Sequence, residues 1–422
     1  MPITIALTQR APLLQNTVQE VGNGSGPFED AFGNLYLVCT NPITGIGQVP
    51  WPDTMNPPVP ALLHCYQSTD NGVTWNELDA ADAVAVTQPN GNLYYASPIA
   101  SCQVNATTFV VAFTQWNYTA ADPPTLQYVE FHMDTGLWGA ISAAGPTVPL
   151  IPSTMSVQYR ASDASIIVEW DGQTETVGGS NYSRAFYAIF NAGWGAAIAI
   201  DPAQTGSTSN YVLSGGVSGS GNRTHFFYTA DTGTTISLDQ ATLTSGNVLE
   251  ALVVVTAQPS GQLPQVTQPF AQNGTTIGVG YGKRPVVTTN QYMSLATSAN
   301  APVFTESLVQ INSEIEAMQS AGTNGAAGLV AAYADGTGVY ASSWPNSGLW
   351  IGPVFVGTLV ASGSFNESLT GQPIAYRSST GFLVNQAVLG EDSADPSLQF
   401  FAFAPGGKTC LLNTVSSLGG SA

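Results

Sequence analysis

Positively charged side chains are the scarcest feature of this chain. Its 422 residues include 8 Lys and Arg against 27 Asp and Glu, a formal net charge of −19. Nucleic-acid phosphates and anionic lipid headgroups are bound largely through clustered cations. With so few cations available, we expect no nucleic-acid partner and no polybasic segment for a membrane surface.

Long apolar runs are also missing. No stretch reaches the roughly 18 uninterrupted apolar residues that indicate a transmembrane helix, so we expect no membrane insertion. Residues 1–5 are not a basic region followed by an apolar core, so no signal peptide is visible. We expect an extracellular or virion location, since lysis of a phage-infected host also releases protein.

Cysteine and histidine are sparse as well. Four cysteines allow three pairings. Cys39 and Cys65 fall in neighbouring predicted strands and form either a disulfide or a pair of buried thiols. The three histidines lie within strand patterns of different repeats, and no cysteine spacing is typical of a metal site. We therefore predict no metal and no cofactor.

Turn residues are abundant. The chain has 44 Gly and 27 Pro, and Val, Thr, Tyr and Phe dominate between the turns, which is a β composition. One octapeptide stands out, in which Ser68, Asp70, Gly72 and Trp75 form the pattern S-x-D-x-G-x-T-W. The Asp side chain can bond the amides of its own turn, Gly supplies a positive φ, and Trp anchors the next strand.

Weaker copies of this turn recur along the chain. The marker positions are 72, 136, 193, 246, 300, 348 and 406. A second marker, a proline that opens a predicted innermost strand, recurs at Pro27, Pro98, Pro269 and Pro373. Proline cannot donate to a strand ladder and so belongs on a sheet edge. Two markers in phase indicate a repeated four-stranded unit.

These turns make the chain resemble the Asp-box (BNR-repeat) sialidase-like β-propeller superfamily over nearly its whole length. The resemblance implies a structural role for Ser68, Asp70, Gly72 and Trp75, on the face opposite the substrate site. The Phe/Tyr-Arg-Ile-Pro signature that opens the sialidase catalytic domain is absent. The corresponding residues are Gly-Pro-Phe-Glu-Asp at 26–30, which argues against sialidase activity.

The predicted fold is all-β: a single propeller of seven four-stranded blades, or six if the last, compact unit belongs to ring closure. Residues 26–415 form the propeller. The segment 1–25, strand-like over 3–8, can complete the last blade, and residues 416–422 form a flexible tail. We expect one short helix, in a loop between blades, because residues 313–316 form a capping box ahead of residues 317–319.

Two sets of residues are candidates for function. Aromatic and basic residues of the predicted between-strand loops could bind a ligand: Trp51, Trp116, Tyr118, Trp170, Lys283 and Arg284. The alternative is that they pin long loops to the scaffold. Residues near the predicted inner strands could line the channel: Glu29, Asp30, Arg160 and Arg377. Glu29 and Asp30 are adjacent in a strand and cannot act as one dyad. We assign no catalytic residue.

The preferred function is non-enzymatic binding or assembly, as a phage tail, nozzle or adhesin-type component of a virion or as another extracellular protein. Its partners would be other proteins or further copies of itself, with surface glycans as a further possibility. The alternative is a carbohydrate-active protein, either a sialidase-like glycoside hydrolase or a lectin. That alternative requires the aromatic loop residues to converge with Lys283 and Arg284, and a carboxylate to lie near a tyrosine.

Overall fold

The structure is a computed structural model. It describes residues 5–10, 24–42, 61–70, 76–78, 84–85, 94–117, 124–148, 154–200, 209–260, 266, 269–272, 276–283, 292–298, 303–310, 317–323, 329–335, 338–344, 351–357, 375–377, 382–388, 398–403 and 410–415.

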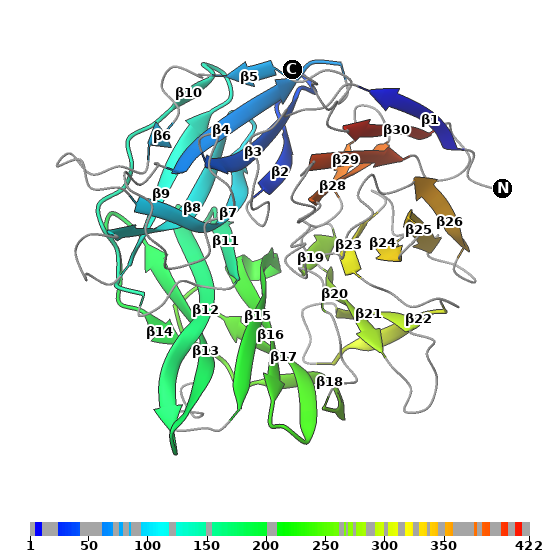
Figure 1. Cartoon of the computed structure of the whole chain (residues 1–422). Coiled ribbons are helices and arrows are strands. Elements are labelled where there is room, and N and C mark those ends of the chain that lie inside the picture. The colour runs from blue at the N-terminus through cyan, green and yellow to red at the C-terminus, as the bar shows by residue number, and fades with distance from the viewer. Residues whose placement is uncertain are drawn as a thin grey trace. The chain divides into compact units, whose positions relative to one another are not determined.

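The described part of the chain is almost entirely β-structure. Its strands form seven sheets, numbered here in chain order (Figure 1). Strands that follow one another in the chain are neighbours in a sheet, except that β6 pairs with β4 and β1 pairs with β30. A 3-10 helix, η2 (Ser220–Asn222), lies between two strands of sheet 4. Repeated four-stranded antiparallel sheets of this kind are consistent with a β-propeller.

By its internal contacts the chain divides into two compact units. The first unit comprises Met1–Ala144, Gly357–Gly371 and Arg377–Ala422, and the second comprises Gly145–Val356 and Gln372–Tyr376.

Sheets 1, 2 and 7 lie mainly in the first unit. Sheet 1 contains β2 (Gly24–Glu29), β3 (Leu35–Pro42), β4 (Ala61–Ser68), β5 (Asn76–Leu78) and β6 (Val84–Ala85). Sheet 2 contains β7 (Tyr94–Asn105), β8 (Thr108–Asn117), β9 (Thr125–His132) and β10 (Leu137–Trp138). Sheet 7 contains β1 (Ile5–Arg10), β27 (Ala375–Arg377), β28 (Phe382–Val388), β29 (Leu398–Phe403) and β30 (Cys410–Val415).

Sheets 3 to 6 lie in the second unit. Sheet 3 contains β11 (Met155–Arg160), β12 (Ser165–Val177), β13 (Ser180–Phe190) and β14 (Ile198–Ala199). Sheet 4 contains β15 (Asn210–Gly219), β16 (Arg223–Asp231), β17 (Thr235–Leu243) and β18 (Val253–Pro259). Sheet 5 contains β19 (Phe270–Gln272), β20 (Thr276–Lys283), β21 (Tyr292–Ser298) and β22 (Thr305–Gln310). Sheet 6 contains β23 (Ala317–Thr323), β24 (Leu329–Asp335), β25 (Gly338–Trp344) and β26 (Ile351–Gly357).

Both sequence markers occupy equivalent places in the sheets. The glycine turns at 136, 193 and 246 each join the third strand of a sheet to the fourth. Pro27 and Pro98 lie in the first strands of sheets 1 and 2, and the strand register shifts around each of them. A bulge at an edge strand is where a residue without an N–H is tolerated.

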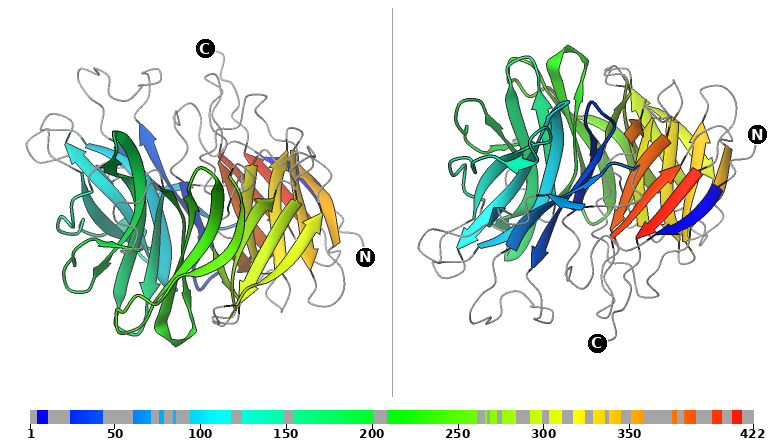
Figure 2. Two further views of the ribbon diagram at one scale, coloured as in Figure 1. Left: turned by 90° about the horizontal axis from the view of Figure 1, so that it is seen from below. Right: turned by 90° about the horizontal axis from the view of Figure 1, so that it is seen from above.

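The two ends of the chain share sheet 7. β1 pairs in parallel with β30, from Ile5 opposite Cys410 to Arg10 opposite Val415. In the right-hand view of Figure 2, β1 (blue) lies beside the red and orange strands of that sheet. This is the position that the sequence suggested for residues 3–8.

The predicted helix at 313–319 is wrong where it can be checked. Ala317, Met318 and Gln319 belong to β23, which pairs with β24, while residues 313–316 lie outside the described residues. The register shifts between Met318 and Ser320. Pairing with a neighbouring strand outweighs a local capping pattern, because most helix stability in a protein comes from tertiary packing.

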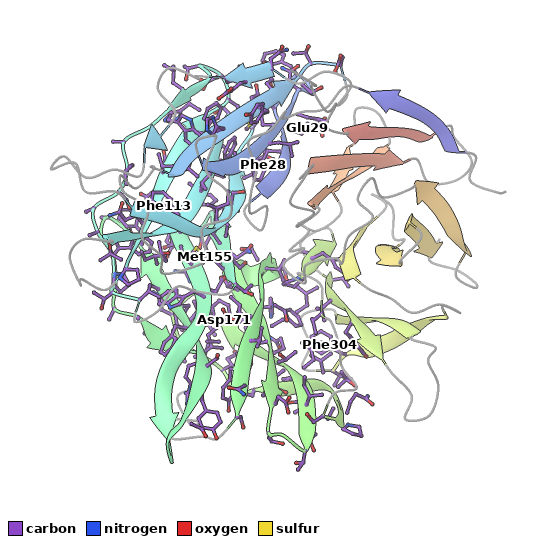
Figure 3. All side chains as sticks on the ribbon, in the orientation of Figure 1. Phe28, Glu29, Phe113, Met155, Asp171 and Phe304 are labelled. Atoms are coloured by element: carbon purple, nitrogen blue, oxygen red, sulfur yellow. The ribbon has the colours of Figure 1, made fainter. Side chains whose placement is uncertain are left out.

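The core lies between neighbouring sheets. In the first unit Phe28, Tyr36 and Val38 of sheet 1 pack with Phe109, Phe113 and Phe131 of sheet 2; Phe28 and Phe113 are labelled in Figure 3. In the second unit sheet 4 is covered on both faces, by Tyr187 and its neighbours from sheet 3 and by Tyr281 and its neighbours from sheet 5. Residues 224–228 of β16 are accordingly buried without alternation.

Phe109 is the central ring of the core between sheets 1 and 2. It is fully buried, with its centroid 4.6 Å from that of Phe28 and 5.1 Å from that of Phe131. Phe109→Ala should lower the free energy of unfolding by about 3–5 kcal/mol because it leaves a cavity. Urea unfolding measures this loss. The exposed control Leu137→Ala should change it by less than about 0.5 kcal/mol, and an equal loss in both variants would contradict the assignment.

Candidate functional site

The structure describes three of the six predicted ligand-binding residues at least in part. Trp51, Tyr118 and Arg284 lie outside the described residues. For Trp116 in β8 and Lys283 in β20 only the backbone is described. Trp170 is not in a loop but inside β12, where it is buried and stacks on Phe186 with centroids 6.1 Å apart. Its ring therefore packs against the neighbouring strand of sheet 3 and is not available to a ligand from solvent.

Asp30 holds the turn between β2 and β3. Its Oδ1 accepts the backbone N–H of Phe32 at 2.8 Å and of Asn34 at 2.9 Å. Its Oδ2 accepts the Asn34 side-chain amide at 2.8 Å and lies 3.0 Å from the hydroxyl of Tyr36. Three N–H groups and the Tyr36 hydroxyl thus surround this carboxylate. The neighbouring Glu29 ends β2, and its carbonyl accepts an N–H from Gln103 at 2.7 Å.

Tyr36 links this turn to the next sheet. It is fully buried, its hydroxyl lies 3.1 Å from the carbonyl of Met133, and it accepts the Gln67 amide at 2.6 Å. Burial and the Asp30 carboxylate raise the pKa of Tyr36 to about 12. A tyrosine held neutral in this way is a structural connector between sheets 1 and 2.

Arg160 makes the corresponding link in the second unit. It is buried at the end of β11 and binds both carboxylate oxygens of Asp163, at 2.9 and 2.6 Å. It also donates to the Asn247 side chain at 2.8 Å and to the Thr244 carbonyl at 3.3 Å, both in the turn between β17 and β18. This predicted channel-lining residue thus connects sheets 3 and 4. Of Arg377 only the backbone, in β27, is described.

Breaking the Arg160 link should destabilise the protein in a pH-dependent way. Hydrogen bonds from Arg160 lower the pKa of Asp163 from 3.8 to about 2, so this stabilisation is present above about pH 4 and is lost as the pH falls towards 2. Arg160→Met removes these hydrogen bonds and should lower the free energy of unfolding at pH 7 by about 2–3 kcal/mol. The loss is smaller than for a fully buried ion pair because Asp163 is 32% exposed, so its carboxylate can be hydrated again. The difference from the unaltered protein should shrink towards pH 2.

The matched control is Arg223→Met, which removes an exposed ion pair with Glu250. It should cost less than about 1 kcal/mol. Urea unfolding at pH 7, 4 and 2 measures all three proteins. Equal losses in the two variants, or a pH-independent loss for Arg160→Met, would contradict the assignment of Arg160.

A buried acidic cluster between sheets 3 and 4 is the feature that the sequence interpretation missed. Asp171 of β12, labelled in Figure 3, accepts the backbone N–H of Thr154 at 2.7 Å and of Leu213 at 2.9 Å. Two residues earlier on the same strand, Glu169 is also fully buried. The only signal was an acidic residue inside the apolar run Ile-Ile-Val-Glu-Trp at 166–170.

Glu169 sits against the backbone of β15. A Cβ at Gly216 would lie 2.6 Å from its Oε1, so a larger residue there would have to displace the carboxyl group. Ser156, opposite Glu169 in the β11–β12 register, accepts the Gly216 N–H at 3.0 Å, and Gln158 donates to the Gly216 carbonyl at 2.5 Å. Among the described residues neither carboxyl oxygen of Glu169 makes a hydrogen bond of good geometry, and the Ser156 hydroxyl lies beside the group.

This environment favours the neutral acid. Burial raises the pKa of Glu169 from 4.5 to about 8, and the nearby Ser156 hydroxyl only partly opposes the rise. Because both oxygens are covered, the group is placed to couple protonation to the packing of the two sheets rather than to act on a substrate.

Stability should therefore fall as the pH rises. A folded-state pKa above the unfolded value gives stability that is complete below about pH 4.5 and is lost as the pH rises through about 8. Glu169→Gln imitates the neutral acid and should abolish this part of the pH dependence, so that at pH 9 it unfolds at a higher temperature than the unaltered protein. Thermal unfolding from pH 5 to 9 measures this. Parallel pH profiles of the two proteins would contradict the assignment.

The remaining predicted residues are placed in part. Ser68 is buried and its hydroxyl donates to Asp70 at 2.8 Å, while Gly72 and Trp75 lie outside the described residues. Cys65 is buried and lies opposite Val38, whereas Cys39 lies opposite His64. The side chain of Cys39 is not described, so the disulfide stays a prediction.

Nowhere in the described part of the chain are three or more His, Cys, Asp or Glu side chains arranged to hold a metal ion. No helix there is long and apolar enough to cross a membrane.

Comparison with known proteins gives structural likeness without a family. No protein-family model matches the chain, and no curated protein matches it. It is similar to the polysaccharide lyase Uly1, with 10% identity over 92% of this chain and 90% of that one and a TM-score of 0.49. It is also similar to an α-L-arabinanase of Penicillium chrysogenum, with 11% identity, coverages of 93% and 97% and a TM-score of 0.45. A protein of unknown function from Dyadobacter fermentans shares 12%, with coverages of 78% and 92% and a TM-score of 0.48. Likeness at this level does not assign an activity to the chain.

Proposed function

We propose that the chain is a seven-bladed, Asp-box-type β-propeller that serves in binding or assembly rather than catalysis. Its setting would be a virion, as a phage tail, nozzle or adhesin-type component, or another extracellular structure. The seven meandering sheets and the sharing of sheet 7 by both chain ends support the propeller. The bond from Ser68 to Asp70 fits a structural Asp-box turn.

The observation that carries the binding role is an exposed apolar edge on sheet 4. β18 is the last strand of that sheet in the described structure. Around it Val248 is 62% exposed, Leu252 37% and Val254 61%. Val248 and Leu252 lie in the turn before the strand and Val254 lies on it. Exposed apolar side chains grouped in this way are suited to an interaction surface, since covering a Val or Leu fully is worth about 1.5–3 kcal/mol. The occupant we propose is another protein of the assembly.

The buried ionisable side chains support the same role. Arg160, Asp171 and Glu169 are placed between sheets 3 and 4, where they hold or adjust the packing. Their contacts join neighbouring sheets and so have a structural role. A stable β-structure with an exposed apolar edge is suited to binding another protein.

The test is whether the protein belongs to a larger particle. Particles from the native source should carry the protein through a density gradient, and electron microscopy with an antibody should locate it on them. Val254→Lys puts a charge into the proposed contact and should reduce incorporation about tenfold or more. Leu137→Lys, on exposed β10 of the other unit, should incorporate normally.

Protein found only free in solution would overturn this proposal. So would turnover of fluorogenic glycosides by the purified protein, or selective binding to a glycan array that Val254→Lys leaves unchanged. These last two results would favour the carbohydrate-active alternative.

A further inference from the structure

The turn between β2 and β3 presents a single phenylalanine to solvent. Phe32 is 90% exposed, more than any other large apolar side chain in the described part of the chain. The equivalent turns of sheets 2, 3 and 4 are tipped by small or polar residues: Ala106 and Thr107, Ala161 and Ser162, and Gly221 and Asn222. The scaffold therefore does not need an aromatic residue at this place.

Several hydrogen bonds also hold the backbone of this turn. The backbone N–H groups of Phe32 and Asn34 both donate to Asp30, and Gly33, with φ of 86°, donates its N–H to the Asp30 carbonyl. Asp30 in turn is bonded to the buried Tyr36. A side chain held on a fixed turn loses little entropy when it binds, and aromatic anchors of this kind dominate many interfaces.

Charge identifies the kind of partner. Residues 11–159 contain eleven Asp and Glu and not one Lys or Arg. Glu29 and Asp30 flank the turn, and Asp134 follows the Met133 carbonyl that Tyr36 contacts. The donors to Asp30 are two backbone amides, the Asn34 side chain and the Tyr36 hydroxyl, and none of them is a Lys or Arg. A second copy of this acidic chain would be repelled, whereas a basic surface would be attracted.

We propose that Phe32 is the anchor by which this chain binds a different protein, through an apolar pocket bordered by Lys and Arg. The proposal deepens the binding role given above and rests on it. It uses a turn of the first unit, whereas the apolar edge at β18 belongs to the second. The two proposed contacts can therefore be tested separately, and one can be disproved without the other.

The test replaces Phe32 with the photocrosslinker p-benzoylphenylalanine in the native source. Irradiation should give one covalent adduct with a different protein, and the crosslinked peptide should be apolar with flanking Lys or Arg. Raising the salt concentration from 0.05 to 0.5 M should reduce the yield several-fold. The same crosslinker at Ala106, on the equivalent turn of sheet 2, should give no such adduct.

Binding to the identified protein then quantifies the anchor. Phe32→Ser should weaken affinity at least tenfold, whereas Phe32→Trp should retain most of it, and both should unfold like the unaltered protein because residue 32 is exposed. An adduct with a second copy of this chain, an adduct in an acidic or polar peptide, or no adduct at all would overturn the proposal. If the protein still travels with particles in that case, the binding role survives and only the Phe32 anchor fails.

Discussion

The burial of both faces of a sheet is the constraint on which the described structure depends. β16 shows it most clearly, since one face packs on sheet 3 and the other on sheet 5. A sheet with two apolar faces needs a packed layer on each side, and sheets 3 and 5 supply both layers for sheet 4. Repetition of one four-stranded unit is the simplest way for a chain to satisfy that requirement.

Polar side chains form hydrogen bonds between neighbouring sheets at the ends of these apolar layers. Tyr36 with Asp30, and Arg160 with Asp163, each connect the turn after the first strand of one sheet to the turn before the last strand of the next. The residues differ but the location in the repeat is the same. Apolar packing has no preferred direction along the strands, and a directional bond at this place sets how far one sheet slides on the next.

Glu169 is the exception within the apolar layers. It is accommodated because Gly216 leaves room for its carboxyl group and because the acid is neutral at moderate pH. An unpaired charge buried at that depth would destabilise the fold by more than the surrounding apolar contacts stabilise it. The buried acid is therefore expected to make the contact between sheets 3 and 4 weaken as the pH rises.

Much of the fold was predictable from short-range chemistry. Turn residues and proline without an N–H act within a few residues, so the turns around 136, 193 and 246 and the edge strands with Pro27 and Pro98 were foreseeable. Only Gly136 has the positive φ expected of glycine; in the other two turns that conformation falls on Ala192 and Asn247. The strand at Ala317 was not, because its partner β24 had to be known first. The roles of Arg160 and Asp30 as connectors were hidden for the same reason, since Arg160 binds residues 84 and 87 positions away.

By itself the sequence determined the β class, the repeated unit, its turns and the absence of cations over 11–159, because each depends on residue type and local spacing alone. Only the tertiary structure decided that Trp170 is buried, that Glu169 is covered and neutral, and that Phe32 faces solvent. Exposure and pKa depend on which sheet packs against which, and that is set by contacts between residues far apart in the chain.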